Sequence, residues 1–376
     1  MRFEDAINIE DLRVIARKRL PRFVFTYVDG GAEDEITLRG NRDAFLRLRF
    51  RPRTLVNVSK RVLSTQMLGA PSALPIVVGP TGLNGLSWPD GDMELARAAS
   101  AAGVPFAMST VSMSLVEDVA REAPGRLWLQ AYVFSERRIT DAIMARARDA
   151  GFECVVLTSD FPVAGKRERD LRTGLLPHQR FTLATRLDML KHPRWLATVA
   201  TRRPRFINVE RELEAGRDVN SFVGHGMFDP SFSWDDVKRI RDLWPRKLLL
   251  KGVLRADDAE RAVAAGIDGL VVSNHGGRQL DGAISAIEAL PEIARSVRGR
   301  VSILVDGGVR RGSDIAKAVA LGAEGVILGR APVYGLAAGG RAGVARAIAI
   351  LADELDRTLA LTGSPNIAAL SADLIA

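Results

Sequence analysis

The sequence predicts a (β/α)8 barrel, also called a TIM barrel, and three observations support this fold class. From residue 74 onward, short apolar runs rich in β-branched residues alternate with helical patterns, which is the order of βα units around a parallel sheet. The runs number eight, as the strands of a TIM barrel do. Polar side chains or glycines close most of these runs, at the end where such barrels build their active sites.

The expected elements follow from these patterns. We expect the eight strands at residues 74–79, 105–109, 127–133, 154–159, 247–252, 269–273, 301–306 and 325–329. We expect helices between them at residues 92–102, 139–150, 256–265, 285–297 and 313–321, several opened by Asp or Ser at the capping position. Residues 1–70 form an N-terminal extension that opens with a helix at 9–19, and residues 343–361 form a terminal helix. We expect all of these to belong to one domain, 1–376.

One connection is much longer than the others. Residues 161–234 separate the fourth and fifth strands, whereas βα loops usually have about two to six residues. Long loops at the carboxyl end of a barrel are typically lids or binding surfaces. We therefore expect this loop at the active site.

Composition limits the class of protein. The chain has 376 residues, of which 47% are hydrophobic, enough for a large buried core. The single cysteine, Cys154, lies in an apolar run and is expected to pack in that core. The chain shows no signal-peptide pattern and no run of about 20 apolar residues, so we expect a cytoplasmic protein. The net charge of +8 favours an anionic partner without identifying it.

The first, third and fourth strands end in residues that could bind a ligand. Gly82, just after the first strand, lets the backbone approach a ligand closely. Gln130 and Tyr132 close the third strand, and Thr158 and Asp160 close the fourth. Because side chains alternate along a strand with a period of two, we expect each pair to point into the barrel together.

The later strands end in candidate catalytic and anion-binding residues. Lys251 closes the fifth strand and places an ammonium at the rim of the barrel. His275 follows the sixth strand with Arg278 three residues later, and a histidine at a barrel mouth that also carries a carboxylate is a candidate base. Glycines and arginines follow the last two strands, at 306–313 and 329–330, where TIM barrels usually bind phosphate.

Three motifs carry a resemblance to a known family. They are SNHGGRQLD at residues 273–281, DGGVRRG at 306–312, and Tyr27 shortly before GGAED at 30–34. With these motifs in this order, the sequence resembles the FMN-dependent L-2-hydroxy acid oxidising family, which includes glycolate oxidase, lactate oxidase, L-lactate dehydrogenase and (S)-mandelate dehydrogenase. Residues 79–92 and 167–170 are most similar to mandelate dehydrogenase, and the long loop is more similar to that of L-lactate dehydrogenase.

The resemblance implies roles for the polar strand ends. His275 would be the base that takes a proton from the substrate, and Asp160 would orient it and stabilise the resulting imidazolium. Arg278 would clamp the substrate carboxylate, which suits a planar guanidinium fork. Lys251 would stabilise the reduced flavin. Further substrate-binding or catalytic roles fall, by the same resemblance, to Tyr27, Tyr132 and Arg167.

The resemblance also implies a noncovalently bound FMN, and we expect no metal site. FMN contacts are expected from Pro80, Thr81, Gly82, Ser109, Gln130, Thr158, Lys251, Ser273, Asp306, Gly308, Arg310, Gly329 and Arg330. Two positions depart from the family pattern. Ala131 replaces a bulkier residue, and Val111 stands where glycolate oxidase has a tryptophan, which leaves room for a larger substrate side chain.

The implied function is FMN-dependent oxidation of an L-2-hydroxy acid of the mandelate or lactate class to the 2-keto acid, with electrons passed to quinone or another acceptor. A soluble oxidase that passes electrons to O2 and makes H2O2 is the alternative.

Another FMN barrel, such as a type 2 isopentenyl diphosphate isomerase, resembles the chain only in its phosphate loops. A nucleic-acid-binding protein would account for the charge, but the aromatic residues that bind bases are not interleaved with the basic ones. We expect no nucleic-acid partner and a homo-oligomer, a tetramer.

The long loop also carries a pattern of basic and apolar residues. Within residues 176–207 the only acid is Asp188, whereas the basic residues are Arg180, Arg186, Lys191, Arg194, Arg202, Arg203 and Arg205, interleaved with Leu187, Met189, Leu190, Trp195, Leu196 and Val199. Such a pattern at helical spacing is typical of a helix in an anionic membrane interface. We therefore expect either a solvated lid or a peripheral contact with the inner face of the cell membrane.

Overall fold

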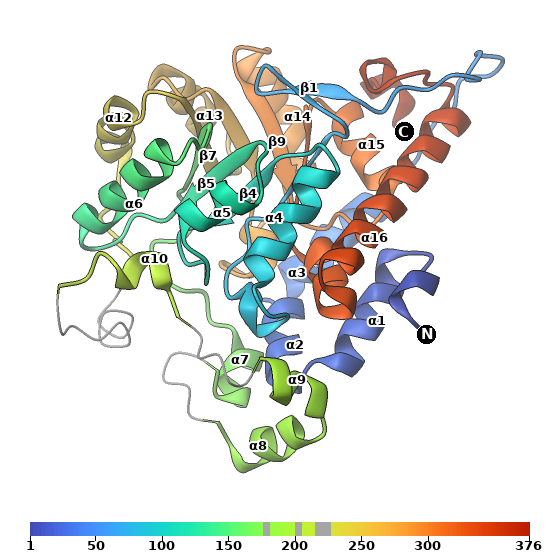
Figure 1. Cartoon of the computed structure of the whole chain (residues 1–376). Coiled ribbons are helices and arrows are strands. Elements are labelled where there is room, and N and C mark those ends of the chain that lie inside the picture. The colour runs from blue at the N-terminus through green and yellow to red at the C-terminus, as the bar shows by residue number, and fades with distance from the viewer. Residues whose placement is uncertain (176–180, 200–204, 215–226) are drawn as a thin grey trace.

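The eight expected strands form a closed parallel barrel in the computed structural model, which describes residues 1–175, 181–199, 205–214 and 227–376 (Figure 1). In order around the barrel they are β10 (Gly325–Leu328), β3 (Ile76–Val78), β4 (Phe106–Ser109), β5 (Leu127–Ala131), β6 (Cys154–Thr158), β7 (Lys247–Val253), β8 (Gly269–Val272) and β9 (Ser302–Asp306). Seven lie within their expected ranges, and β7 extends one residue beyond its own. The predicted fold class is confirmed.

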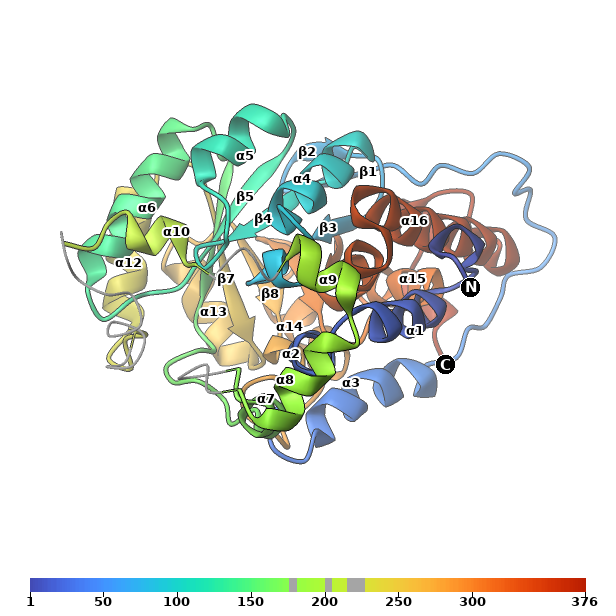
Figure 2. The ribbon, with the colours of Figure 1, turned by 60° about the horizontal axis from the view of Figure 1, so that its bottom comes forward.

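Helices surround the barrel (Figure 2). They are α4 (Gly91–Ala101), α5 (Val116–Glu122), α6 (Arg137–Asp149), α12 (Trp234–Leu243), α13 (Ala256–Ala264), α14 (Ala286–Val297), α15 (Gly312–Ala320) and α16 (Arg330–Thr362). The sequence analysis did not predict α5 and α12. It placed the start of the terminal helix at residue 343, whereas α16 begins at Arg330 and is interrupted by non-helical backbone at Gly339 and Gly340.

The last helix also qualifies, by length and composition alone, as a membrane span. This differs from the expectation that no segment of the chain is apolar enough to span a membrane. However, 61% of its most apolar 18-residue window is buried inside the protein. It packs against α4 and against α1 (Ile9–Arg19), as a core helix does.

The N-terminal extension covers parts of both ends of the barrel. It contains η1 (Phe3–Asp5), α1, α2 (Arg22–Asp29) and α3 (Ile36–Arg47), then a hairpin of β1 (Thr65–Met67) and β2 (Ala70–Ser72). Met67 and Leu68 of the hairpin join the apolar cluster inside the barrel. The helix α3 contacts η3 (His275–Gly277), which follows β8 at the carboxyl end. The other short helices are η2 (Asn84–Leu86), η4 (Ile367–Ala369) and η5 (Ala372–Leu374).

The long connection after β6 contains helices in its described parts. They are α7 (Glu168–Thr173), α8 (Leu183–Leu190), α9 (Pro193–Thr198) and α10 (Ile207–Glu210). Figure 1 shows α8 and α9 at the bottom, near α2 and α7. The carboxylate Oδ2 of Asp188 accepts from the backbone N–H of Arg22 at 2.6 Å, and Trp195 Nε1 donates to the carbonyl of Leu86 at 2.7 Å. These contacts hold α8 and α9 against the rim. Arg180, Arg202 and Arg203 of the basic pattern lie outside the described residues.

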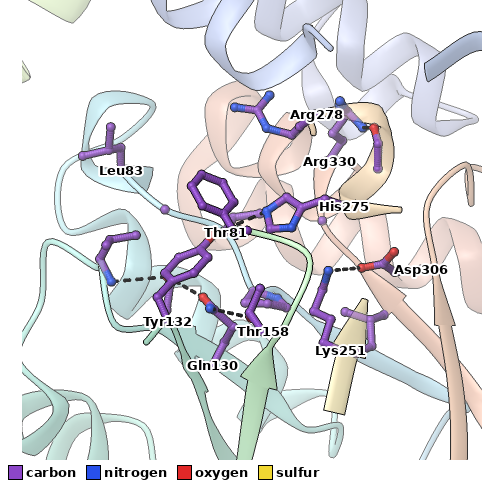
Figure 3. A pocket seen from close by; sticks show the side chains of 18 of the residues that line it. Thr81, Leu83, Gln130, Tyr132, Thr158, Lys251, His275, Arg278, Asp306 and Arg330 are labelled. Carbon is purple, nitrogen blue, oxygen red and sulfur yellow. Dashed lines mark hydrogen bonds and ion pairs between the residues drawn. The ribbon is translucent and has the colours of Figure 1, made fainter. Parts of the chain in front are cut away.

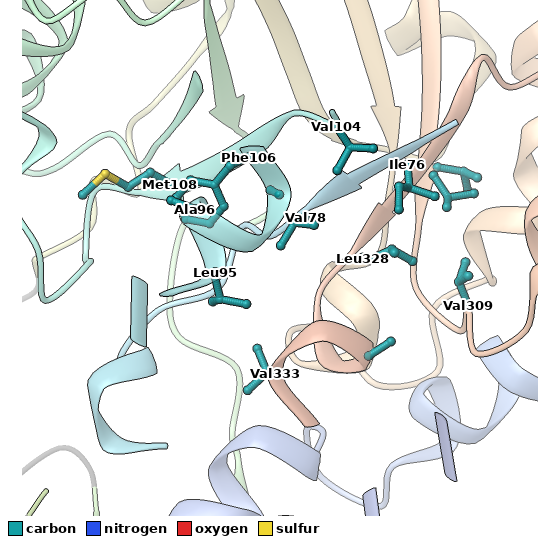
Figure 4. Packing of buried hydrophobic residues seen from close by; sticks show 14 of the residues in the cluster. Ile76, Val78, Leu95, Ala96, Val104, Phe106, Met108, Val309, Leu328 and Val333 are labelled. Atoms are coloured by element: carbon teal, nitrogen blue, oxygen red, sulfur yellow. The ribbon is translucent and has the colours of Figure 1, made fainter. Parts of the chain in front are cut away.

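Strand alternation divides the core into two parts. Outward-facing side chains such as Ile76, Val78 and Phe106 pack against the helices, including Leu95 and Ala96 of α4 (Figure 4). Inward-facing apolar side chains fill the lower barrel: Val77, Ala107, Trp128, Cys154, Val156, Leu249, Val271, Leu304 and Ile327. Cys154 therefore packs in the core, as expected.

A polar layer lies directly above this apolar layer. Because inward positions recur every second residue, the next ones toward the carboxyl end are Ser109, Gln130, Thr158, Lys251, Ser273, Asp306 and Gly329. The barrel therefore brings polar side chains from six strands, with Gly329 from a seventh, together at one end. These are the strand-end residues that the sequence singled out.

Candidate active site

The polar layer forms the floor of a cavity of about 490 Å³. The residues expected to contact FMN line this cavity, except Ser273: Pro80, Thr81, Gly82, Ser109, Gln130, Thr158, Lys251, Asp306, Gly308, Arg310, Gly329 and Arg330. The expected substrate-binding and catalytic residues also line it, except Asp160: Tyr27, Tyr132, Arg167, His275 and Arg278. Ser273 and Asp160 are not lining residues, but each contacts Lys251 and His275, which are.

His275 forms a hydrogen bond to Asp160. The His275 side chain lines the cavity (Figure 3). The distance from His275 Nδ1 to Asp160 Oδ1 is 2.8 Å, and Nε2 lies 3.4 Å from the hydroxyl of Tyr132. The backbone N–H of His275 donates to Ser273 Oγ at 3.0 Å, which helps to hold a φ of 57° that is strained in a non-glycine residue. Nε2 is therefore the ring nitrogen available to a ligand.

Two carboxylates surround the buried ammonium of Lys251. Its Nζ donates to Ser273 Oγ at 2.7 Å and lies 3.0 Å from Asp306 Oδ2 and 3.8 Å from Asp160 Oδ2. Burial lowers the pKa of Lys251, but the two carboxylates raise it above its usual value. Burial raises the pKa of Asp160, but Lys251 and His275 bring it below its usual value. Both groups therefore stay charged at neutral pH.

Arg278 is held by neutral groups. Its Nη1 donates to the carbonyls of Tyr27 and Gly30, at 2.7 and 2.9 Å, and its guanidinium lies 5.0 Å from the centre of the Tyr27 ring. Burial and the nearby charge of Arg167 lower the pKa of Arg278. Among the described residues no carboxylate lies within 4 Å of it, so an anionic ligand would supply the missing countercharge.

A second anion site lies between β9, β10 and the start of α16. Arg330 donates to the carbonyls of Val28, Gly30 and Gly276, at 3.1, 2.8 and 3.0 Å. Its burial is the largest influence that lowers its pKa, to about 10. The first turn of α16 has no side-chain cap, so its backbone N–H groups are available to a phosphate.

Gly308 and Asp306 complete this end of the cavity. Gly308 has a φ of 90°, and a Cβ there would lie 2.3 Å from the carbonyl oxygen of Asn41, so no other residue fits. Asp306 Oδ1 is buried without a hydrogen-bond partner in the described residues. Such an oxygen needs a donor, which a ribityl hydroxyl would supply.

The residues present thus fit FMN along the length of the cavity. Arg310, Arg330 and the start of α16 suit the phosphate, and Asp306 suits the ribityl chain. Ser109 donates to Gln130 at 2.7 Å, and Gln130 donates to Thr158 at 2.8 Å, which fixes the polar floor for a flat ring. Lys251 supplies a fixed cation next to that floor.

Comparison with known proteins agrees with this fit. The sequence model of the FMN-dependent dehydrogenases matches residues 16–376. The chain belongs to the FMN-dependent dehydrogenase family. The (S)-mandelate dehydrogenase of Pseudomonas putida is 45% identical over 374 residues, which are 99% of this chain and 94% of that protein. An L-lactate dehydrogenase of Xanthomonas campestris is 41% identical over 369 residues, 97% of this chain and 95% of that protein.

A solved structure of a relative matches over almost the whole chain. The crystal structure of the monotopic membrane protein (S)-mandelate dehydrogenase has a TM-score of 0.94 and 44% identity, and 99% of each chain is covered. The resemblance read from the sequence motifs is confirmed. The protein is an oxidoreductase of the 2-hydroxy acid dehydrogenase and oxidase family, and its cofactor is FMN.

Three aromatic residues of the cavity, Phe161, Phe206 and Phe228, were missed by the sequence analysis. Phe161 lies with its ring centre 5.3 Å from that of His275, 5.0 Å from that of Tyr132 and 4.4 Å from that of Phe228. Together Tyr132, Phe161 and Phe228 form an apolar wall beside Nε2 of His275. Phe161 directly follows Asp160 and was detectable as a strand-end residue. Phe228 lies at the far end of the long loop, where no pattern marked it.

Proposed function

We propose that the protein oxidises an L-2-hydroxy acid of the mandelate class to the 2-keto acid, with His275 as the base. One observation carries the proposal: a histidine–carboxylate pair, an arginine that has no carboxylate partner in the described part of the chain, and a site that fits FMN all open onto one cavity. The relatives named for mandelate and lactate dehydrogenation support this substrate class.

The residues of the cavity have separate roles in this reaction. Arg278, with Arg167 and Tyr27, binds the substrate carboxylate and so orients the hydroxyl-bearing carbon toward His275. Since Nδ1 of His275 donates its proton to Asp160, Nε2 has a free lone pair and accepts a proton from the substrate. The carboxylate of Asp160 then stabilises the imidazolium.

FMN supplies the two-electron acceptor of this oxidation when it is bound. The ammonium of Lys251 offsets negative charge next to the floor of the cavity. The aromatic wall and the long connection reduce access of water to Nε2, which strengthens the electrostatic effects of Asp160 and Lys251.

The size of the substrate side chain depends on Val111. This residue lines the cavity, and its Cγ2 lies 3.0 Å from where a Cβ on Gly82 would be. A small side chain there, in a cavity that also has a wall of three aromatic rings, leaves space for an aromatic substrate. We infer that mandelate is accepted beside or ahead of lactate.

A larger residue at this position should narrow the substrate range. In Val111→Trp we expect kcat/KM for (S)-mandelate to fall about 10- to 100-fold, since overpacking of this size costs roughly 1–3 kcal/mol. The value for glycolate should change much less. A substrate panel with mandelate, lactate and glycolate measures this, with Val62→Trp at an exposed site as the control. A wild-type enzyme that strictly prefers glycolate would refute the proposed substrate class.

We also propose that the enzyme binds peripherally to an anionic membrane through α8 and passes its electrons to quinone. Leu183, Leu187 and Leu190 form a stripe at positions i, i+4 and i+7 of this helix and are exposed. Exposed basic side chains flank the stripe, Arg186 on α8 and Lys191 directly after it. The solved mandelate dehydrogenase named as a monotopic membrane protein supports the proposal.

Vesicle sedimentation tests the membrane contact. We expect the wild-type enzyme to sediment with vesicles that contain anionic lipid at low salt, and the triple variant Leu183→Gln, Leu187→Gln, Leu190→Gln to stay in the supernatant. The control replaces three leucines elsewhere that are also more than half exposed, Leu55, Leu280 and Leu361, and should sediment like the wild type.

The electron acceptor is tested on the same preparations. We expect the reduced enzyme to react rapidly with a soluble quinone and slowly with O2. A wild-type enzyme that stays in the supernatant and is rapidly reoxidised by O2 would establish the soluble oxidase instead. The expected homotetramer stays a prediction.

A further inference from the structure

The end of α2 holds two arginines of the cavity with its backbone. The carbonyl oxygen of Gly30 accepts from Arg278 Nη1 at 2.9 Å and from Arg330 Nη2 at 2.8 Å. The neighbouring carbonyls of Tyr27 and Val28 accept from Arg278 and Arg330, at 2.7 and 3.1 Å. The position of residues 27–30 therefore determines where both guanidinium groups lie.

These carbonyls hold the arginines without neutralising them. The carbonyls at the C-terminus of a helix carry partial negative charge and attract cations. Among the described residues, no carboxylate lies within 4 Å of Arg278 or Arg330. A carboxylate partner would compete with an anionic ligand, whereas a carbonyl leaves the positive charge available to it.

Asp29 fixes this end of α2 to three other helices. Its buried carboxylate accepts from Arg13 of α1 at 2.6 and 3.0 Å, from the hydroxyl of Tyr334 of α16 at 2.8 Å, and from Arg169 of α7 at 3.4 Å. The ring of Tyr334 in turn lies 5.6 Å from the guanidinium of Arg310, which lines the phosphate end of the cavity. Asp29 does not itself line the cavity.

We propose that Asp29 is a positioning residue for both anion sites: it fixes the carbonyls of residues 27–30, which aim Arg278 at the substrate carboxylate and Arg330 at the FMN phosphate. The part of this proposal that concerns the substrate rests on the function proposed above. The part that concerns FMN rests only on the family and on the cavity. Loss of the Asp29 carboxylate therefore weakens the binding of both the substrate and FMN, although neither ligand contacts Asp29.

The variant Asp29→Asn tests this in the full-length protein. We expect KM for (S)-mandelate to rise about tenfold and kcat to stay within about threefold of the wild type. The charge-assisted hydrogen bonds of Asp29 position the residues that bind the substrate and take no part in the reaction itself. We expect the Kd of FMN, measured by quenching of FMN fluorescence on titration into the FMN-free protein, to rise about tenfold as well.

Glu153→Gln is the matched control. Glu153 accepts from Arg126 at 2.8 Å and from Trp128 Nε1 at 2.6 Å, just before β6 and therefore at the amino end of the barrel. Glu153→Gln thus removes a carboxylate that accepts from an arginine and an aromatic side chain, as Asp29 does from Arg13 and Tyr334, but far from both anion sites. Its KM and FMN Kd should stay within about twofold of the wild type.

A double mutant separates positioning from a general loss of structure. If Asp29 acts through Arg330, adding Asp29→Asn to Arg330→Met should weaken FMN binding little further. A full additional tenfold loss in that background, or an unchanged Kd and KM in Asp29→Asn alone, would overturn the proposal. If Asp29→Asn does not fold, Tyr334→Phe replaces it, because it removes one hydrogen bond to Asp29 and keeps the ring near Arg310; both constants should then rise by a smaller factor.

These experiments also distinguish the proposed role of Asp29 from the proposed function. A wild-type protein that oxidises no 2-hydroxy acid would refute the proposed function, whereas the FMN titrations would still decide whether Asp29 positions Arg330.

Discussion

Replacement of His275 by Gln is expected to lower kcat by about 10²- to 10⁴-fold while FMN stays bound, since this is the usual contribution of a positioned general base. Nε2 of His275 faces the cavity, and Asp160 holds the opposite ring nitrogen. Glutamine has similar size and can keep a hydrogen bond to Asp160, but it accepts no proton at neutral pH. Rapid mixing with (S)-mandelate under anaerobic conditions measures the rate of FMN reduction directly.

The matched control is His192→Gln, which makes the same substitution at the start of α9. Its rate should equal that of the wild type. Reduction at a near wild-type rate in His275→Gln would remove His275 from the mechanism.

The decrease of kcat/KM at low pH provides a second test of His275 as the base. Burial is the largest influence on the pKa of His275 and lowers it, and Asp160 opposes this only in part, so the pKa lies below its usual value. The base works only when it is neutral, so kcat/KM should fall as the pH falls through this lowered pKa. The plateau should therefore extend below about pH 6.5, the usual histidine value. His275→Gln should lose this limb.

The second large effect is expected for Arg278→Lys, which should lower kcat/KM for (S)-mandelate by about 10- to 100-fold. The substitution keeps the charge but loses the planar fork. An ammonium cannot reach the carbonyls of Tyr27 and Gly30 and also present two donors to a carboxylate. Steady-state kinetics should show a higher KM and a lower kcat.

Arg172→Lys makes the same exchange on the exposed face of α7, where Arg172 pairs with Glu168, and should leave both constants unchanged. Unchanged constants in Arg278→Lys itself would mean that the substrate carboxylate binds elsewhere.

Side-chain patterns predicted the floor of the active site well. Each barrel strand has an inward apolar residue followed, two positions later, by a polar residue or glycine, so Gln130, Thr158, Lys251 and Asp306 could be placed from the period of two alone. Asp160 was expected to point into the barrel with Thr158. Its carboxylate lies beside His275 and Lys251, which line the cavity, although Asp160 is not itself a lining residue.

The upper part of the site was much less predictable. The arginines Arg278 and Arg330 are held by the carbonyl of Gly30, and a backbone group leaves no mark in a residue pattern. Helices α2 and α3 were not expected, and Phe228 joins the aromatic wall only because the long connection returns to the barrel there. Such long-range contacts depend on tertiary packing that no local pattern specifies.

The boundaries of some helices were wrong for identifiable reasons. The terminal helix was expected to begin at residue 343, but α16 begins at Arg330, forms part of the phosphate end there, and has non-helical backbone at Gly339 and Gly340. The helix α12 was included in the loop although Ser233 and Asp236 form a capping box at its start, which was a readable signal.

The most direct test of the proposed function is the anaerobic addition of (S)-mandelate to the purified protein while FMN absorbance is followed. We expect acid release to yield FMN, and we expect (S)-mandelate to bleach the bound FMN with one keto acid formed per FMN. The enantiomer (R)-mandelate should leave the absorbance unchanged, because the carboxylate at Arg278 and the base at His275 fix which face of the substrate carbon is presented. A flavin that is bleached by neither mandelate, lactate nor glycolate, or bleached equally by both enantiomers of mandelate, would contradict the function proposed for this site.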